Sequence, residues 1–139
     1  MLSATNSLSN NSIKCLSLCQ PNAWLIFHGS NIQSQNYSTN HKGLILIHAG
    51  KFANKRQLKQ IQKTNPLTPA ELPTQAIIGS AELVSCSWSD EARNGGEAYA
   101  YHWYFHQAFL WDKYIPFVAK DILFNIPFEM IKSYDINLL

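Results

Sequence analysis

The sequence predicts a single α+β domain: a small, barrel-like, mostly β fold with two or three short helices. The first observation is length, because 139 residues of 46% hydrophobic composition suit one core and leave little room for two. The second is that most apolar segments are short and bounded by Gly, Pro or Asn, which is typical of strands. The third is that few segments combine helical spacing with capping residues.

Residues 1–11 are rich in Ser and Asn and predict a disordered tail, so the domain is expected to span residues 12–139. The expected strands cover residues 12–18, 31–37, 43–50, 75–88, 98–110 and 114–118. The segment 43–50 is apolar on both faces, which indicates a central strand. Gly79 indicates a bulge, Pro116 indicates an edge strand, and residues 94–96 indicate a turn.

Short helices are expected over residues 23–27, 54–63 and 127–133. The first has Pro21 before it and Gly29 after it, which are usual at helix starts and ends. Asn54 can cap the second, whose Leu58 and Ile61 would then face the core. Its lysines recur every four residues, so they would form one basic stripe on the exposed side.

The charge is unevenly distributed along the chain. Residues 1–70 carry seven Lys and Arg and no acid, whereas the remainder carries four Lys and Arg against nine acids. An acid-free segment of this length predicts a surface that attracts a polyanion. The candidate phosphate contacts are Lys42, Lys51, Lys55, Arg56 and Lys59. The simpler interpretation of the helical ones is a solvated helix face.

Several classes of protein and site are not indicated. No apolar run approaches about 18 residues, so neither a spanning helix nor a membrane partner is expected. The start of the chain lacks the pattern of a secretory signal, and three cysteines cannot all pair, so we expect a cytoplasmic location. Neither a phosphate-binding glycine loop nor a nucleophile elbow occurs. His102 and His106, like Cys15 and Cys19, are spaced four apart on strands, so no metal or other cofactor is expected.

Five pieces of the chain, in order, resemble the activating-signal-cointegrator homology (ASCH) domain. Residues 15–24 resemble its opening "LSLxQPxA", and residues 29–43 resemble its "GxKxxExRxWxTxYRG" with one residue fewer. Residues 44–49 match "LLIHA" and residues 76–84 match "AIIGxxELV". The closing strands and turn resemble residues 101–104, 115–116 and 123–127.

The resemblance implies a mostly antiparallel β-barrel of the PUA-like superfamily, named for pseudouridine synthases and archaeosine transglycosylases. Proteins of that superfamily mostly bind RNA, often at modified or structured nucleotides. Some small ASCH proteins hydrolyse acylated cytidine or have been proposed as ribonucleases, through a charged cluster in a cleft beside the first helix. The matching cleft positions here include Gln20, Pro21, Trp24, Tyr37 and Thr39. A helix N-terminus favours anions there, although the simpler interpretation of Gln20 and Trp24 is capping and core packing.

The sequence departs from the family at three cleft positions. Asn31, Gln33 and Gln35 stand where the family has Lys, Glu and Arg. Amides cannot transfer protons as catalytic groups do, but they can hydrogen-bond base edges. The three alternate along an expected strand, so they would share one face, either the floor of a cleft or a solvated surface. The replacement favours recognition over catalysis.

The leading hypothesis is therefore an RNA-binding or other nucleic-acid-binding protein whose amide-lined cleft holds a base, a nucleotide or a modified nucleoside. An alternative is an amidohydrolase of acylated cytidine or a weak ribonuclease, which needs Lys42 or Lys51 within reach of Tyr37 or Thr39. A third is a protein-interaction module in transcription coactivation, which predicts an exposed apolar patch. The aromatic run at Tyr101 and residues 103–105 could stack bases or fill the core.

Overall fold

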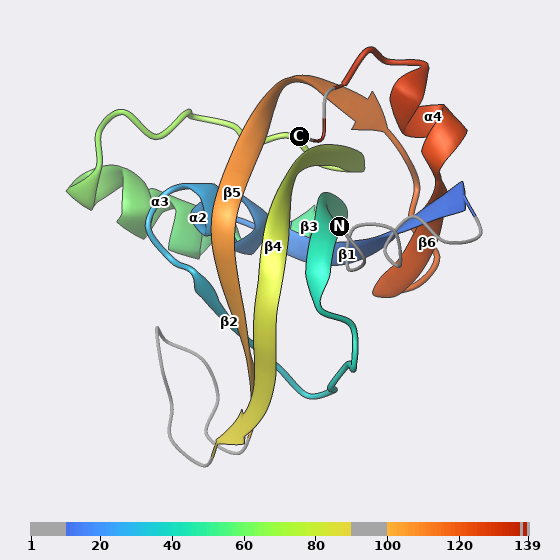
Figure 1. The fold of residues 1–139 in the computed structure, drawn as a ribbon. Coiled ribbons are helices and arrows are strands. Elements are labelled where there is room, and N and C mark those ends of the chain that lie inside the picture. Colours follow the sequence, from blue (N-terminus) through green and yellow to red (C-terminus); the bar gives the residue numbers. More distant parts are fainter. Residues whose placement is uncertain (1–10, 90–99, 137, 139) are drawn as a thin grey trace.

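The computed structural model describes residues 11–89, 100–136 and 138 (Figure 1). The elements in chain order are β1 (Ser12–Gln20), α2 (Asn22–Phe27), β2 (Ile32–Gln35), β3 (Gly43–Ala53), α3 (Lys55–Thr64), β4 (Ala76–Ser89), β5 (Ala100–Pro116), β6 (Leu123–Pro127) and α4 (Phe128–Lys132). The expected tail at residues 1–10 and the expected turn at 94–96 lie outside the described residues. Within the described part of the chain, every helix is too short or too polar to cross a bilayer.

The six strands form one sheet in the order β2-β5-β4-β3-β1-β6, and every neighbouring pair is antiparallel except β1 with β3. The predicted α+β class is thus confirmed. The sheet is open, because its edge strands β2 and β6 are not paired with each other. The predicted barrel is therefore not closed, and its two edges are the shortest strands of the sheet, with four and five residues.

The centre of the sheet has the predicted character. β3 lies between β4 and β1, with Ile45 and Ile47 in a core cluster on one face and Leu46 in a second cluster on the other. The pairing of β4 with both neighbours shifts around Gly79, which confirms the predicted bulge. Asn54 caps α3 by accepting a hydrogen bond from the backbone N–H of Gln57, as predicted.

The separate edge strand predicted at residues 114–118 is wrong. β5 runs without a break to Pro116, which ends the strand opposite Ala76 of β4. Ile77 pairs with Ile115 and Gly79 pairs with Leu110, so two residues of β4 stand opposite five residues of β5 at this point. Such irregular pairing interrupts the alternation of inward-facing and outward-facing side chains along β5. The sequence pattern therefore predicted two strands where the structure has one.

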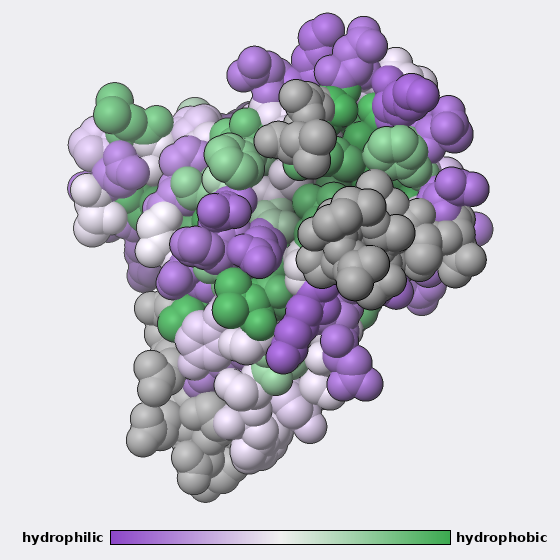
Figure 2. All heavy atoms as spheres, in the orientation of Figure 1, coloured by the Kyte–Doolittle hydropathy of each residue, from purple (hydrophilic) through white to green (hydrophobic). Residues whose placement is uncertain are grey.

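Two helices cover opposite faces of the sheet. α2 lies behind the sheet in Figure 1 and buries Ala23 and Ile26 in the first core cluster. α4 buries Ile131 in the second cluster, together with Ile13 and Ile126. Figure 2 shows the face turned away from α2, where hydrophilic and apolar residues are interspersed and an apolar patch lies over β4 and β5. α3 projects to one side of the sheet, so most of its surface is open to solvent (Figure 1).

Candidate nucleic-acid interface

The start of α2 is held by Gln20, which is 1% exposed. Its Oε1 accepts a hydrogen bond from the backbone N–H of Trp24 at 2.9 Å. Its Nε2 donates to the carbonyl oxygen of Pro73 at 2.8 Å. Pro21, also buried, occupies the N-cap position. Both polar atoms of the Gln20 side chain are therefore used to hold the start of α2, which is the capping role that the sequence allowed.

Trp24 is half-buried on the exposed side of α2. Its ring stacks on the ring of His28, with centroids 3.9 Å apart and planes 11° apart. One face of the indole is thus already covered by the next turn of the same helix.

The three amides expected to share one open face do not do so. Gln33 pairs with Trp103 across β2 and β5, and paired residues point to the same side of a sheet. Because Trp103 lies in the core beneath α2, Gln33 also points inward and is 6% exposed. Asn31 precedes β2 and is exposed, and Gln35 is half-buried. These residues therefore do not form a continuous polar floor.

Asn22 joins the three elements that the predicted site draws on. Its backbone carbonyl accepts a long hydrogen bond from Gln33 Nε2 at 3.5 Å, and its Oδ1 accepts one from Gln57 Nε2 at 3.4 Å. The backbone N–H of Asn54 donates to the carbonyl oxygen of Gln20 at 2.7 Å. α2, β2 and the start of α3 thus meet at one place. Sequence reasoning missed Asn22 and Gln57, although Asn22 directly follows the Gln-Pro pair.

The first turns of α3 concentrate positive charge. Lys55, Arg56 and Lys59 are exposed, whereas Leu58 faces inward. No acid occupies the first turn, so two cations sit at the positive end of the helix dipole. Among the described residues, no ion pair within 4.0 Å joins these side chains to a carboxylate, although Glu71 lines the same shallow pocket as Lys55 and Lys59.

The end of β3 adds a cation and an aromatic ring to this region. Phe52 is 71% exposed, and Lys51 Nζ lies 5.9 Å from the centre of its ring. Because α3 begins two residues after β3 ends, these side chains are next to the helix start. We call the combined region the α3 basic surface, made up of Lys51, Phe52, Lys55, Arg56 and Lys59. Phe52 was missed by sequence reasoning, and its position between Lys51 and Lys55 was the available signal.

Lys42 lies away from the α3 basic surface. It precedes Gly43, the first residue of β3, whereas Lys51 lies near the end of that strand. Eight residue steps of a strand span up to about 26 Å. The connection from β2 to β3 that carries Lys42 is at the lower end of the sheet in Figure 1, and α3 is at its side.

Tyr37 and Thr39 belong to that same connection and have no lysine bonded to them. The Tyr37 hydroxyl is buried without a hydrogen-bond partner among the described residues. Burial, and next the nearby charge of Cys86, raise the pKa of Tyr37, so its phenol is neutral near pH 7. Thr39 Oγ1 accepts a hydrogen bond from the backbone N–H of His41 at 3.1 Å. The arrangement that the hydrolase alternative required is therefore not present in the described part of the chain.

The aromatic run on β5 divides between core and surface. Trp103 and Phe105 are buried in the cluster beneath α2, so they are not a platform for stacking bases. Tyr101 and Tyr104 are half-buried, and Tyr101 packs edge-to-face against Trp88.

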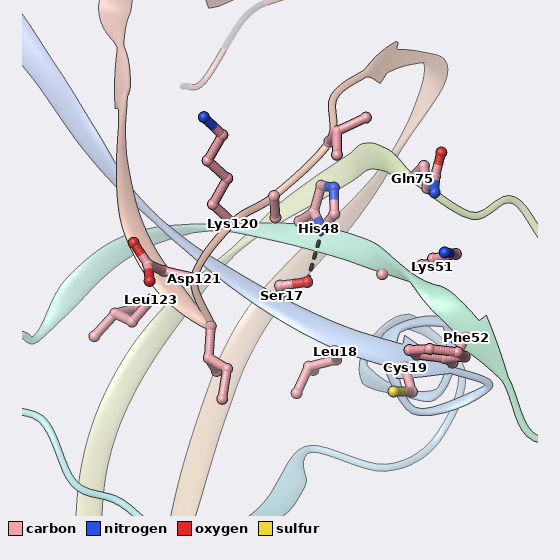
Figure 3. A pocket seen from close by; sticks show the side chains of 14 residues that line it. Ser17, Leu18, Cys19, His48, Lys51, Phe52, Gln75, Lys120, Asp121 and Leu123 are labelled. Carbon is pink, nitrogen blue, oxygen red and sulfur yellow. Dashed lines mark hydrogen bonds between the residues drawn. The ribbon is translucent and has the colours of Figure 1, made fainter.

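Sequence reasoning also missed a serine–histidine pair in a pocket between β1, β3 and the β5–β6 connection (Figure 3). Ser17 and His48 are direct partners in the parallel pairing of β1 and β3, although they are 31 residues apart in sequence. Ser17 Oγ lies 2.8 Å from His48 Nδ1, and His48 Nε2 lies 2.6 Å from the carbonyl oxygen of Phe117. Burial lowers the pKa of His48 below its ordinary value of 6.5, an effect that the bond to Phe117 partly opposes.

This lowered pKa predicts a loss of stability in mild acid. Above about pH 6.5 the imidazole is neutral in both folded and unfolded chains, and its contribution to stability is fully present. Below that pH the unfolded chain gains a proton that the folded chain does not, so unfolding becomes easier by up to about 1.4 kcal/mol per pH unit. The decrease in the free energy of unfolding ends once the pH is below the pKa of His48 in the folded chain. Urea denaturation between pH 7.5 and 5, compared for the wild type and His48→Gln, measures it, and an equal slope in both proteins would contradict the assignment.

Comparison with protein-family models and with curated proteins finds no match for this chain. Among the described residues, no group of three or more His, Cys, Asp or Glu side chains is arranged to hold a metal ion.

Proposed function

We propose that this protein binds RNA or another nucleic acid through the α3 basic surface. The observation that carries the proposal is the gathering of four cations and one exposed aromatic ring where β3 runs into α3. Lysine and arginine side chains neutralise phosphates, and an exposed ring can stack on any base. The surface therefore offers both interactions that single-stranded nucleic acids require.

Two amides, one of them on α3 itself, support recognition in place of catalysis. Asn31 is exposed, and Gln57 reaches from α3 to the start of α2. Amide groups donate and accept hydrogen bonds at base edges without changing protonation state. We propose that a nucleotide or a modified nucleoside lies against these groups while its phosphates contact Lys55 and Arg56.

We further propose that the chain is a divergent ASCH domain and that its open sheet is a variant of the PUA-like barrel. The motifs that carry the resemblance fall on α2 and on all six strands of the sheet. A cytoplasmic location is part of the proposal, because Cys15, Cys19 and Cys86 are all free thiols, as a reducing compartment would keep them.

The test is fluorescence anisotropy with a labelled single-stranded RNA at several salt concentrations. With four phosphate contacts, the affinity is expected to fall about 50-fold between about 50 and about 200 mM salt. The triple variant Lys55→Gln, Arg56→Gln, Lys59→Gln removes three of these contacts. Its plot of log affinity against log salt is expected to be shallower by about two units of slope.

Lys42→Gln is the matched control, since it removes one cation far from the α3 basic surface. It should leave both the affinity and the salt slope close to those of the wild type. A loss of log affinity in Lys42→Gln that is one third of the loss in the triple variant would show that net charge alone attracts the RNA. Absence of binding to any RNA or DNA tested would reject the proposal and favour a protein partner.

A further inference from the structure

The pocket that contains Ser17 and His48 borders the α3 basic surface, because Lys51 and Phe52 line it as well. It has a volume of about 770 Å³, and its lining includes Ser17, His48, Lys51 and Lys120. In Figure 3 the serine and histidine lie between the two lysines. Ser17 is half-buried, and His48 is 1% exposed.

The hydrogen bonds around His48 determine where its proton lies. A backbone carbonyl oxygen can only accept, so the bond to Phe117 requires the proton on Nε2. The neutral ring then presents an unprotonated Nδ1 to Ser17, whose hydroxyl donates to it at 2.8 Å. The edges of the Phe117 and Phe124 rings pack against the imidazole and restrict its orientation. Ser17 thus supplies a hydroxyl, His48 supplies a base within hydrogen-bond reach of it, and the Phe117 carbonyl oxygen orients the base.

The backbone leaves the serine hydroxyl open to the pocket. Gly50 of β3 lies beside Ser17, and a Cβ at that position would come within 3.3 Å of Ser17 Oγ. Ser17 itself is fixed, since its backbone N–H donates to the carbonyl oxygen of Ile122 at 2.7 Å. The absence of a side chain at residue 50 therefore preserves the space in front of a rigidly held hydroxyl.

We propose that Ser17 is a nucleophile activated by His48 and that this pocket is a second site, one that cleaves carboxylic esters. Ser17 Oγ attacks the ester carbonyl carbon while its proton passes to His48 Nδ1. The bond between that carbon and the alcohol oxygen then breaks, and the departing oxygen takes the proton from His48. Water, deprotonated by His48 in the same way, attacks the acyl-serine, releases the carboxylic acid and returns the proton to Ser17.

The pocket walls indicate the class of ester. The exposed side chains of Val118 and Ile122 line the pocket and offer apolar surface for an acyl chain, while Lys51 and Lys120 favour negative charge on the leaving part. Asp121 also lines the pocket and repels an anionic substrate, but its one negative charge is outnumbered by the two lysines. The inferred substrate is an ester with an apolar acyl group and an alcohol part that carries negative charge as it leaves. The inference does not rest on RNA binding, although Lys51 belongs to both sites, and its test uses the protein without RNA.

The experiment treats the wild-type protein with a fluorophosphonate probe and locates the label by peptide mass spectrometry. The expected reaction forms a bond between Ser17 Oγ and phosphorus, expels fluoride and leaves the proton on His48. Hydrolysis of p-nitrophenyl butyrate is measured in parallel and should stop when Ser17 is labelled. Ser17→Ala should abolish both, and Gly50→Ala should slow labelling by about 10- to 100-fold, because it crowds the hydroxyl.

Ser87→Ala is the control, as Ser87 is an exposed serine on β4 away from this pocket. It should be labelled and should hydrolyse the ester like the wild type. A folded wild-type protein that takes no label on Ser17, or takes it on another serine, would overturn the proposal. Ser17 would then serve only to satisfy the buried His48. Because the labelled residue is identified in the wild-type protein, this outcome can be observed even if a variant fails to fold.

Discussion

Replacing Trp103 by alanine is expected to lower the free energy of unfolding by about 4 kcal/mol. The side chain is 0% exposed and lies in the core cluster between the sheet and α2. Its Nε1–H donates to the backbone carbonyl of Tyr37 at 3.0 Å, and its ring meets the Tyr37 ring edge-to-face at 5.4 Å. The substitution therefore removes a large buried ring and also releases the connection between β2 and β3.

The comparison with Trp103→Phe separates these two contributions. Phenylalanine retains most of the buried apolar surface but leaves the Tyr37 carbonyl without its donor, which costs about 1–2 kcal/mol. Urea denaturation followed by circular dichroism gives both values. A loss in Trp103→Ala no larger than that in Trp103→Phe would show that the ring is not the main source of stability. RNA binding by the α3 basic surface should persist in whatever fraction of each variant remains folded.

Sequence patterns within single segments correctly predicted two elements. Asn54 identified the start of α3, and the apolar residues on both faces of 43–50 identified the central strand β3. The continuity of β5 and the open edges of the sheet could not be predicted in this way. Both depend on the register between strands distant in sequence, and a bulge changes which face a side chain occupies.

The positions of the candidate site residues could likewise be predicted only where they depend on a single segment of the chain. The four-residue spacing of Lys55 and Lys59 on one helix correctly placed both on its exposed side. Lys42 and Lys51 flank the strand predicted at residues 43–50, so their separation along β3 could have been predicted. Gln33 is buried because of its pairing with Trp103, and Ser17 meets His48 because two parallel strands align them. These placements arise from pairings that only the complete fold determines.

Replacing Gly79 by alanine is expected to lower the free energy of unfolding by about 3 kcal/mol. Gly79 lies at the bulge of β4, where the Phe27 ring of α2 and the carbonyl oxygen of Phe109 both approach its Cα closely. A Cβ would lie 2.7 Å from the Phe27 ring and in steric overlap with the Phe109 carbonyl. The carbonyl belongs to the backbone of β5 and cannot turn aside, so either α2 must lift from the sheet or the pairing of β4 with β5 must open.

Gly50→Ala tests whether this cost comes from the close approach or merely from the loss of a glycine in a strand. The closest atom to a Cβ at Gly50 is the Ser17 hydroxyl oxygen at 3.3 Å, a milder approach than that at Gly79, so Gly50→Ala should lower the free energy of unfolding much less than Gly79→Ala. Thermal melting should show Gly79→Ala lowered by about 10 °C and Gly50→Ala by much less. Equal melting temperatures for the two variants would mean that Phe27 can move away freely. α2 would then be held on the sheet by Ala23 and Ile26 alone, and the start of α2 at Asn22, where β2 and α3 meet, would be less firmly placed than the hydrogen bonds of Gln20 suggest.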